Sequence, residues 1–176
     1  MARDGNTTTY TVTNTLKGGI NIKKVIDVAD EYKQFVNEDQ LFTFTIKLFD
    51  ANGDPVYTGE NAASGTLGTR YYKDDGTTVR GTVPDTGIVT LTMKASESIR
   101  IVNVPAGTYY TVEEGDLSST VYEFKESEWL VRHHPSIGSE EWVTDGSETV
   151  TNSQTTNSHR IYPNSENNVT FTNTYE

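Results

Sequence analysis

Three polar residues, Lys24, Glu114 and Asn173, occupy positions of strand-like runs where apolar residues are expected. Each follows two apolar residues at alternate positions, in the runs INIKK, YTVEE and VTFTN. Because successive side chains of a strand point to opposite faces, each of the three should point toward the core with its apolar neighbours. A polar residue in such a place is poorly accommodated unless it bonds to something.

A buried lysine, glutamate and asparagine form a reactive set. Burial disfavours the ammonium form of lysine and the ionised form of glutamate. A neutral amine is a nucleophile, and a neutral carboxylic acid can donate a proton to an amide oxygen. The carboxamide of the asparagine then becomes an electrophile that can lose ammonia. The product would be an amide bond between two side chains.

Two neighbouring residues are alternatives for two of these positions. Lys23 adjoins Lys24, and Glu113 adjoins Glu114. Strand phase favours Lys24 and Glu114, which lie two residues after an apolar neighbour, but a bulge in either strand would reverse the choice. Taken singly, such residues are more often surface or strand-end residues, so the predicted chemistry depends on the three acting together.

The elements that must position these residues are predicted to be strands. Alternating runs such as INIKKVI, LFTFTIKLFD, GIVTLTMK, SIRIVNV and TYYTVEE are separated by Gly-, Pro- and Asn-rich turns. No amphipathic helix of useful length is evident, and the connection DVADEYKQFVNEDQ is weakly helical at best. Residues 126–166 are predicted to be irregular, with one or two short strands near WLVR and ETVTN. The pattern predicts an all-β sandwich.

Composition excludes several functional classes. The chain has 176 residues and a formal net charge of −11, which disfavours nucleic acids and anionic membranes as partners. It has no cysteine, which excludes disulfides, thiolate catalysis and Cys-ligated zinc. No apolar run is long enough to span a membrane and no signal peptide is evident, so any export or anchoring signal is expected outside this sequence.

No metal or cofactor is expected. The run that starts at Asp50, DANGD, faintly resembles the start of a calcium loop, but the twelfth position is Asn61 where a bidentate glutamate is needed. His133 and His134 are adjacent and would face opposite ways on a strand. The aromatic residues of 122–142 could form a glycan-stacking surface, although covering a core beneath a long loop is the more common role.

Four short motifs in order resemble a known family. YTVEE fits the Tyr-x-Leu/Val-x-Glu pattern called the E-box in pilins of Gram-positive bacteria. VPAGTYYTVEE, KASESIRIVNV, INIKKVI with LFTFTIKLFD, and VTFTNTYE are together similar to CnaB-type domains, the immunoglobulin-like repeats of pilins and cell-wall adhesins. The resemblance covers about residues 20–114 and resumes at 167–176, whereas 126–166 has no clear counterpart.

The resemblance implies an immunoglobulin-like (CnaB-type) β-sandwich with one long irregular insertion. It also implies an intramolecular isopeptide bond between Lys24 and Asn173, with Glu114 as the proton shuttle and with Lys23 and Glu113 as the alternates. Such a bond forms once per molecule, so the chain is expected to cross-link itself autocatalytically without being an enzyme that turns over, and no cofactor is required.

Two similar strand endings suggest a domain joint. TYTVTNTLKGG near the start shares an alternating strand and a Thr-Asn-Thr ending with NNVTFTNTYE at the end. Residues 1–17 are therefore interpreted as a linker and the closing-strand remnant of a preceding domain, and residues 18–176 as the sandwich domain. Asn14 would then have no partner in this chain and should remain an ordinary asparagine.

The predicted function is structural: a stalk or shaft module of a bacterial cell-surface adhesin or pilus. The expected location is extracellular, with anchoring to the cell wall through sequence outside this chain. The expected partners are neighbouring domains of the same tandem protein, other pilin subunits or a host ligand. Tyr162-Pro163 is followed by Asn164 where a pilin motif would carry lysine, which favours a stalk domain over a polymerising pilin.

An alternative is a ligand-binding adhesin domain that recognises a host matrix protein or glycan through the 126–166 insertion. A third possibility is a hydrolytic enzyme with a β-sandwich fold. A pocket with clustered carboxylates would support it, but the sequence gives no evidence of one and contains no recognisable nucleophile motif.

Overall fold

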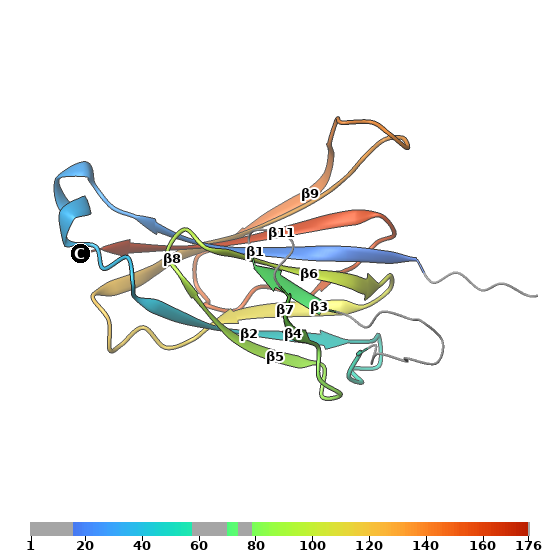
Figure 1. The fold of residues 1–176 in the computed structure, drawn as a ribbon, viewed down its shortest axis with the longest axis horizontal. Helices are drawn as coiled ribbons and strands as arrows, with labels where there is room; N and C mark the ends of the chain where they lie inside the picture. Colours follow the sequence, from blue (N-terminus) through green and yellow to red (C-terminus); the bar gives the residue numbers. More distant parts are fainter. Residues whose placement is uncertain (1–15, 58–69, 74–78, 176) are drawn as a thin grey trace, which may run out of the picture.

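Two β-sheets pack face to face (Figure 1). The computed structural model describes residues 16–57, 70–73 and 79–175. The seven-stranded sheet has the order β4 (Val79–Thr82), β3 (Arg70–Lys73), β6 (Ser98–Pro105), β1 (Lys17–Asp27), β11 (Ser165–Tyr175), β8 (Tyr122–His133) and β9 (Val143–Val150). The four-stranded sheet has the order β10 (His159–Arg160), β7 (Tyr109–Glu114), β2 (Leu41–Phe49) and β5 (Ile88–Lys94). The predicted all-β, immunoglobulin-like sandwich is confirmed.

The core lies between the sheets and follows the two-residue period of the strands. In β2, the side chains of Phe42, Phe44, Ile46 and Leu48 are buried, while the intervening residues are more exposed. β1, β5, β6, β7 and β11 supply further buried residues at alternate positions. An inward-facing polar residue on any of these strands therefore has to be accommodated inside an apolar layer.

The first and last strands are central neighbours in the seven-stranded sheet. β1 and β11 run parallel and pair from Gly19 with Glu166 to Asp27 with Thr174. β1 begins at one end of the long axis of the domain, and β11 ends at the other, near the short helix η1 (Figure 1). A chain that enters at β1 therefore leaves at the opposite pole, next to the strand through which it entered.

β1 starts earlier than the sequence suggests. Lys17 was expected to belong to a linker and the first strand was expected in INIKKVI, but Lys17, Gly18 and Gly19 already belong to β1. Gly18 explains the difference, because a Cβ atom there would lie 2.7 Å from Ile161 Cγ2, which leaves room for glycine alone. Residues 1–15, with the predicted closing-strand remnant and Asn14, lie outside the described residues.

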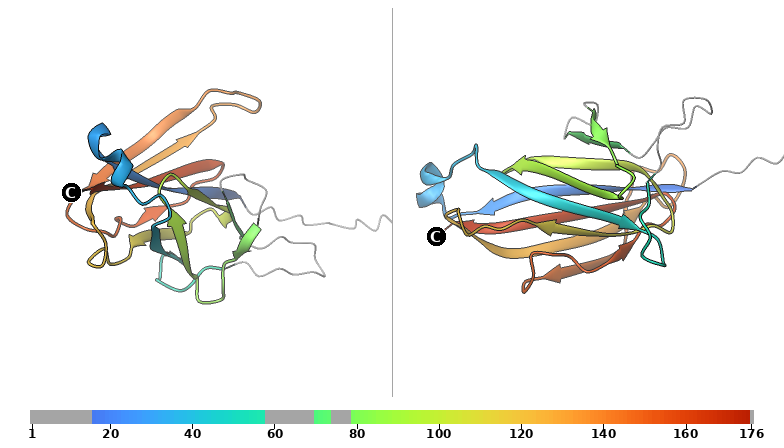
Figure 2. Two further views of the ribbon diagram at one scale, coloured as in Figure 1. Left: turned by 60° about the vertical axis from the view of Figure 1, so that its left-hand side comes forward. Right: turned by 90° about the horizontal axis from the view of Figure 1, so that it is seen from below.

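The segment 126–166 is more regular than expected. β8 is 12 residues long and β9 is 8 residues long, and together they form an antiparallel hairpin. The loop of this hairpin projects beyond the body of the sandwich (Figure 2). β8 pairs with β11 along its whole length, so its strand conformation comes from this partner rather than from its own apolar pattern.

The connection from β1 to β2 contains the one helix in the described part of the chain, the 3₁₀ segment η1 (Asp30–Phe35), which buries no residue. None of the described helices has the length and apolar composition that crossing a membrane requires. The turn after β2 is closed by the carboxylate of Asp50, which accepts backbone N–H bonds from Asn52 at 2.8 Å and Asp54 at 3.0 Å. Asp50 therefore stabilises a turn, as the following Asn52-Gly53 sequence predicts.

Candidate functional site

Lys24, Glu114 and Asn173 meet in the interior of the sandwich. Lys24 and Asn173 are 0% exposed and Glu114 is 2% exposed. Lys24 comes from β1 and Asn173 from β11, whereas Glu114 reaches across from β7 in the opposite sheet. Asn173 lies opposite Ile26, two residues beyond Lys24, so the lysine and the asparagine are diagonal neighbours on the parallel strand pair.

One carboxylate oxygen joins the three residues. Lys24 Nζ lies 3.1 Å from Glu114 Oε1. The same oxygen accepts a hydrogen bond of 2.9 Å from Asn173 Nδ2. Within the described part of the chain, Glu114 Oε2 and Asn173 Oδ1 are buried without a hydrogen-bond partner. The two oxygens that most need a donor are therefore the free carboxyl oxygen and the amide carbonyl.

The amine of Lys24 has further contacts on its own side of the site. It lies 3.3 Å from the backbone oxygen of Val25 and 3.4 Å from that of Phe171. It also lies 4.8 Å from the centroid of the Phe42 ring. These contacts hold the amine in place, because the two carbonyl oxygens accept hydrogen bonds from it and the ring attracts a positive charge.

Aromatic rings enclose the site. The rings of Phe44 and Phe171 meet edge to face with their centroids 5.3 Å apart, and Phe124 lies 6.4 Å from Phe171. Phe44 is also the cross-strand neighbour of Glu114 on β2. The lysine, the glutamate and the asparagine therefore lie in an apolar shell of low effective dielectric constant.

Burial changes the pKa of both ionisable groups. Desolvation lowers the pKa of Lys24 to about 8, although the attraction of Glu114 opposes the shift. Desolvation also raises the pKa of Glu114, against the opposing effects of Lys24 and Asn173. The loss of water thus outweighs the mutual attraction for both groups, which makes proton transfer from the ammonium to the carboxylate less costly than it is in water.

The two alternates lie outside this cluster. Lys23 and Glu113 are both exposed, and Glu113 Oε2 accepts a hydrogen bond of 3.2 Å from Thr155 Oγ1. The irregularity in β1 lies between Gly18 and Ile20, before the two lysines, so it does not exchange their faces. The structure therefore brings Lys24, Glu114 and Asn173 together and leaves Lys23 and Glu113 on the outer surfaces.

The structure contains a second buried polar cluster, formed by Asn167, Tyr110 and Trp129, which the sequence pattern did not predict. Asn167 is 0% exposed, and its Oδ1 accepts a hydrogen bond of 3.0 Å from the hydroxyl of Tyr110. The indole N–H of Trp129 donates to the same hydroxyl at 2.9 Å. The signal was present, because Asn167 precedes Val169 by two residues and so shares the inward phase. This cluster ties β8 to the sandwich, and Trp129 covers the core as its more common role predicts.

The adjacent histidines lie on the hairpin surface. His133 Nδ1 is 2.7 Å from Asp145 Oδ2, and the ring of His134 lies 3.6 Å from that of Trp142. Among the described residues, no three His, Asp or Glu side chains gather in a way that could hold a metal ion.

Comparison with known proteins places the chain in a family. Residues 18–175 match the family described as Domain of unknown function (DUF7601). The chain belongs to this family. No curated protein matches the sequence of this DUF7601 domain.

Solved structures of pilus proteins resemble the DUF7601 domain. The major pilin from Streptococcus pyogenes aligns with a TM-score of 0.59 and 19% identity, over 91% of this chain and 48% of the pilin. A second major pilin from that organism aligns at 0.54 with 13% identity, over 92% and 46%. A pilus-presented adhesin aligns at 0.50 with 18% identity, over 90% and 27%. The DUF7601 domain thus has a pilin-like fold and spans about half the length of the pilins or less.

The lowered pKa of Lys24 predicts a pH dependence of stability. In the variant Asn173→Ala, which keeps the lysine and cannot form an amide with it, the native pKa of about 8 lies below the ordinary 10.5. Between these values the unfolded chain binds one proton more, so the free energy of unfolding should rise as pH rises through this window. Chemical denaturation at several pH values measures it.

The matched control for this measurement is Asn173→Ala with Lys24→Met, which removes the titrating amine. The difference between the two variants isolates Lys24 from the other groups that titrate at alkaline pH. A difference that stays constant across the window would show that the native pKa of Lys24 is not lowered.

Proposed function

We propose that this domain is a load-bearing module of a pilus or surface adhesin, stabilised by an isopeptide bond between Lys24 and Asn173. The observation that carries the proposal is the shared contact: the lysine amine and the asparagine carboxamide both lie within about 3 Å of one buried oxygen of Glu114. Three groups with complementary chemistry and no access to water form a reaction site rather than a surface ion pair.

The first step is a proton transfer within the buried pair. Desolvation of both charges lowers the pKa of Lys24 and raises that of Glu114, so it reduces the free-energy cost of forming the neutral amine and the neutral acid. Rotation of the Asn173 carboxamide by half a turn then exchanges its nitrogen and oxygen. This places Oδ1 where the protonated carboxyl of Glu114 can donate a hydrogen bond to it, and the carbonyl becomes more electrophilic.

The second step exchanges one amide for another. Lys24 Nζ attacks Asn173 Cγ, the Nζ–Cγ bond forms and the Cγ–Nδ2 bond breaks. Glu114 takes a proton from the attacking amine and gives one to the departing nitrogen, which leaves as ammonia. The carboxyl group of Glu114 is regenerated, whereas Lys24 and Asn173 are consumed, so the reaction occurs once and the domain is not a turnover enzyme.

The rigid strands supply the orientation that substrate binding gives in an enzyme. The lysine and the asparagine lie on paired strands, and the glutamate is fixed by the opposite sheet. Holding two reactants together in this way can replace a concentration of about 10⁵ M or more. No cofactor is needed for this amide exchange.

The bond would carry tension past most of the chain. β1 and β11 are parallel neighbours whose outer ends lie at opposite poles of the domain (Figure 1). Tension that enters at Lys17 reaches Lys24, crosses the bond to Asn173 and leaves through Tyr175. The strands between residues 25 and 172 then stay outside the load path, so tension does not pull the two sheets apart.

The wider setting is part of the proposal. The pilin-like fold and the motifs around Glu114 and Asn173 support a CnaB-type domain of a Gram-positive surface protein, extracellular and anchored to the cell wall through other parts of that protein. Its partners would be neighbouring domains of the same chain or other pilin subunits. The acidic surface, with a formal net charge of −11, suits a protein surrounded by water.

The bond itself is tested by intact mass spectrometry of the purified domain. Its mass should be lower than the sequence mass by one ammonia, and a digest should contain one peptide that joins Lys24 to Asn173. Lys24→Met and Glu114→Gln should each restore the full mass, because one lacks the nucleophile and the other lacks the proton shuttle.

Lys23→Met and Glu113→Gln are the matched controls, and both should keep the bond. Loss of the bond should also lower the free energy of unfolding by about 5 kcal/mol, the chain-entropy value for a cross-link that closes so long a loop. A folded domain with the full sequence mass would refute the proposed bond.

The mechanical role is tested by pulling a single molecule from both ends. The cross-linked domain should show no unfolding step at forces that leave covalent bonds intact, because the load path avoids the sheets. Asn173→Ala should unfold in a step that releases most of the chain. Unfolding steps of equal length in both proteins would contradict the proposed load path.

The β8–β9 hairpin favours a second candidate function, a ligand-binding adhesin domain that recognises a host matrix protein or glycan through 126–166. Three large apolar residues are exposed on this hairpin: Ile137, Trp142 and Val143. Exposed apolar patches mark interaction surfaces, and these three residues lie in the loop of the hairpin and at the start of β9. The labelled domain should then bind on an array of glycans and matrix proteins, and Trp142→Ala should abolish binding while Tyr32→Ala, at the other pole, should not. A domain that binds nothing on the array is a stalk only.

A further inference from the structure

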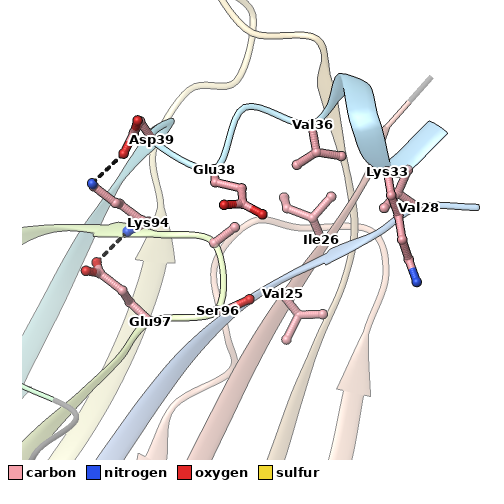
Figure 3. A pocket seen from close by; sticks show the side chains of 11 residues that line it. Val25, Ile26, Val28, Lys33, Val36, Glu38, Asp39, Lys94, Ser96 and Glu97 are labelled. Atoms are coloured by element: carbon pink, nitrogen blue, oxygen red, sulfur yellow. Dashed lines mark hydrogen bonds and ion pairs between the residues drawn. The ribbon is translucent and has the colours of Figure 1, made fainter. Parts of the chain in front are cut away.

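A hollow lies at the end of the sandwich that contains the buried trio (Figure 3). It has a volume of about 560 Å³ and is bounded by η1, the end of β1 and the turn between β5 and β6. Ile26, Val28 and Val36 form its apolar part. Its charged side chains are Lys33, Glu38, Asp39, Lys94 and Glu97. Such charged groups keep their hydration, so the hollow is open to water.

Ile26 separates this water from the reaction site. Its register partner across the β1–β11 pair is Asn173, and no other residue that lines the hollow is opposite that asparagine among the described residues. Ile26 has the same inward phase as Lys24, is partly buried and packs against the core. Ile26 therefore lines the hollow and is also the direct neighbour of Asn173 in the sheet.

The remaining sides of the site are closed by larger groups. Phe42 lies against the amine of Lys24, and Phe44 and Phe171 pack edge to face beside the carboxyl group. Ile26 is the last inward-facing residue before β1 ends at Asp27. The shell between Asn173 and this hollow is thus formed by the aliphatic side chain of Ile26, whereas the ring of Phe124 lies beside Asn173 on the β8 side.

We propose that Ile26 is a specificity-determining residue of the site, a wall that keeps water from Asn173 so that Lys24 is the only nucleophile. The inference rests on the proposed isopeptide bond and adds the reason why the activated amide is not hydrolysed. The carboxamide that accepts a lysine also accepts water, because both nucleophiles add to the same carbon.

The competing reaction is hydrolysis of the Asn173 carboxamide. The oxygen of a water molecule bonds to Asn173 Cγ, the Cγ–Nδ2 bond breaks, and the nitrogen leaves as ammonia with a proton passed through Glu114. The residue becomes aspartate, and Lys24 keeps its amine. Water in the site would also hydrate Lys24 and favour its ammonium form, which is not a nucleophile. Both effects of an opened wall divert the site from cross-linking.

The test replaces Ile26 with serine in the full chain. The protein is made by cell-free synthesis, and samples taken over time are analysed by intact mass and by peptide mapping. In the wild type, Asn173 should appear only in the joined peptide. In Ile26→Ser, joining should be slower by about tenfold for each pKa unit that Lys24 regains, and part of residue 173 should appear as aspartate.

Val36→Ser is the matched control. Val36 lines the same hollow and is also partly buried against the core, but it does not belong to a strand that pairs with β11 at Asn173. Val36→Ser removes a comparable apolar side chain, so a general loss of stability would appear in both Val36→Ser and Ile26→Ser. Val36→Ser should join like the wild type, without aspartate at position 173. Ile26→Val keeps the wall and should also join like the wild type.

Each other result overturns the inference. Ile26→Ser that joins at the wild-type rate without aspartate shows that no wall is needed. Slower joining without aspartate assigns Ile26 a packing role only, and aspartate in Val36→Ser to the same extent shows that the effect is not local. If Ile26→Ser does not fold, Ile26→Ala gives the same comparison. A wild type that never loses ammonia refutes the proposed bond instead, so the two failures are distinguishable.

Discussion

The buried contact between Lys24 and Glu114 is the interaction to which the rest of the structure must adapt. Taking an ammonium and a carboxylate out of water costs several kcal/mol for each ion, and their attraction offsets this only when the geometry is good. Here the pKa of the lysine falls and that of the glutamate rises, so desolvation outweighs attraction for both. Such a pair persists inside a core only when the surrounding packing holds it there.

The architecture supplies that packing by placing the two groups on different sheets. Lys24 belongs to β1 and Glu114 to β7, so the pair forms only when the two sheets are face to face. Asn173 joins from β11, which is hydrogen-bonded to β1 along nine consecutive residue pairs. The parallel central strands fix the spacing of the lysine and the asparagine, and the opposite sheet fixes the carboxyl group between them.

The trio was predictable from the sequence because it obeys the two-residue period of a strand. The runs INIKK, YTVEE and VTFTN place each polar residue two positions after an apolar one, and the structure buries all three. The same period separates Lys24 from Lys23 and Glu114 from Glu113. No property of the local sequence states that these strands are neighbours, and that information came from the resemblance to CnaB-type domains.

Other features could not be predicted in this way. β8 and β9 contain many polar residues because one face of their hairpin is open to water, and their pairing is set by β11 rather than by local pattern. The start of β1 contains two glycines, which usually indicate a linker, but here Gly18 allows Ile161 to approach the strand. Asn167 was missed although it shares the inward phase, since its partners Tyr110 and Trp129 come from distant strands.

The order of events in the proposed maturation follows from the same geometry. Lys24 and Asn173 approach each other only after β1 and β11 pair, and Glu114 arrives only with the opposite sheet, so folding has to precede the bond. The unlinked fold must therefore be stable with a desolvated pair and two unpartnered oxygens in its core. Its stability comes from the aromatic and aliphatic layers between the sheets.

The reaction then replaces the amine and the carboxamide with one neutral amide and releases ammonia, which removes a buried group that could carry charge. The proposed bond would thus lock a fold that already exists, and the site would become less costly to bury as it reacts.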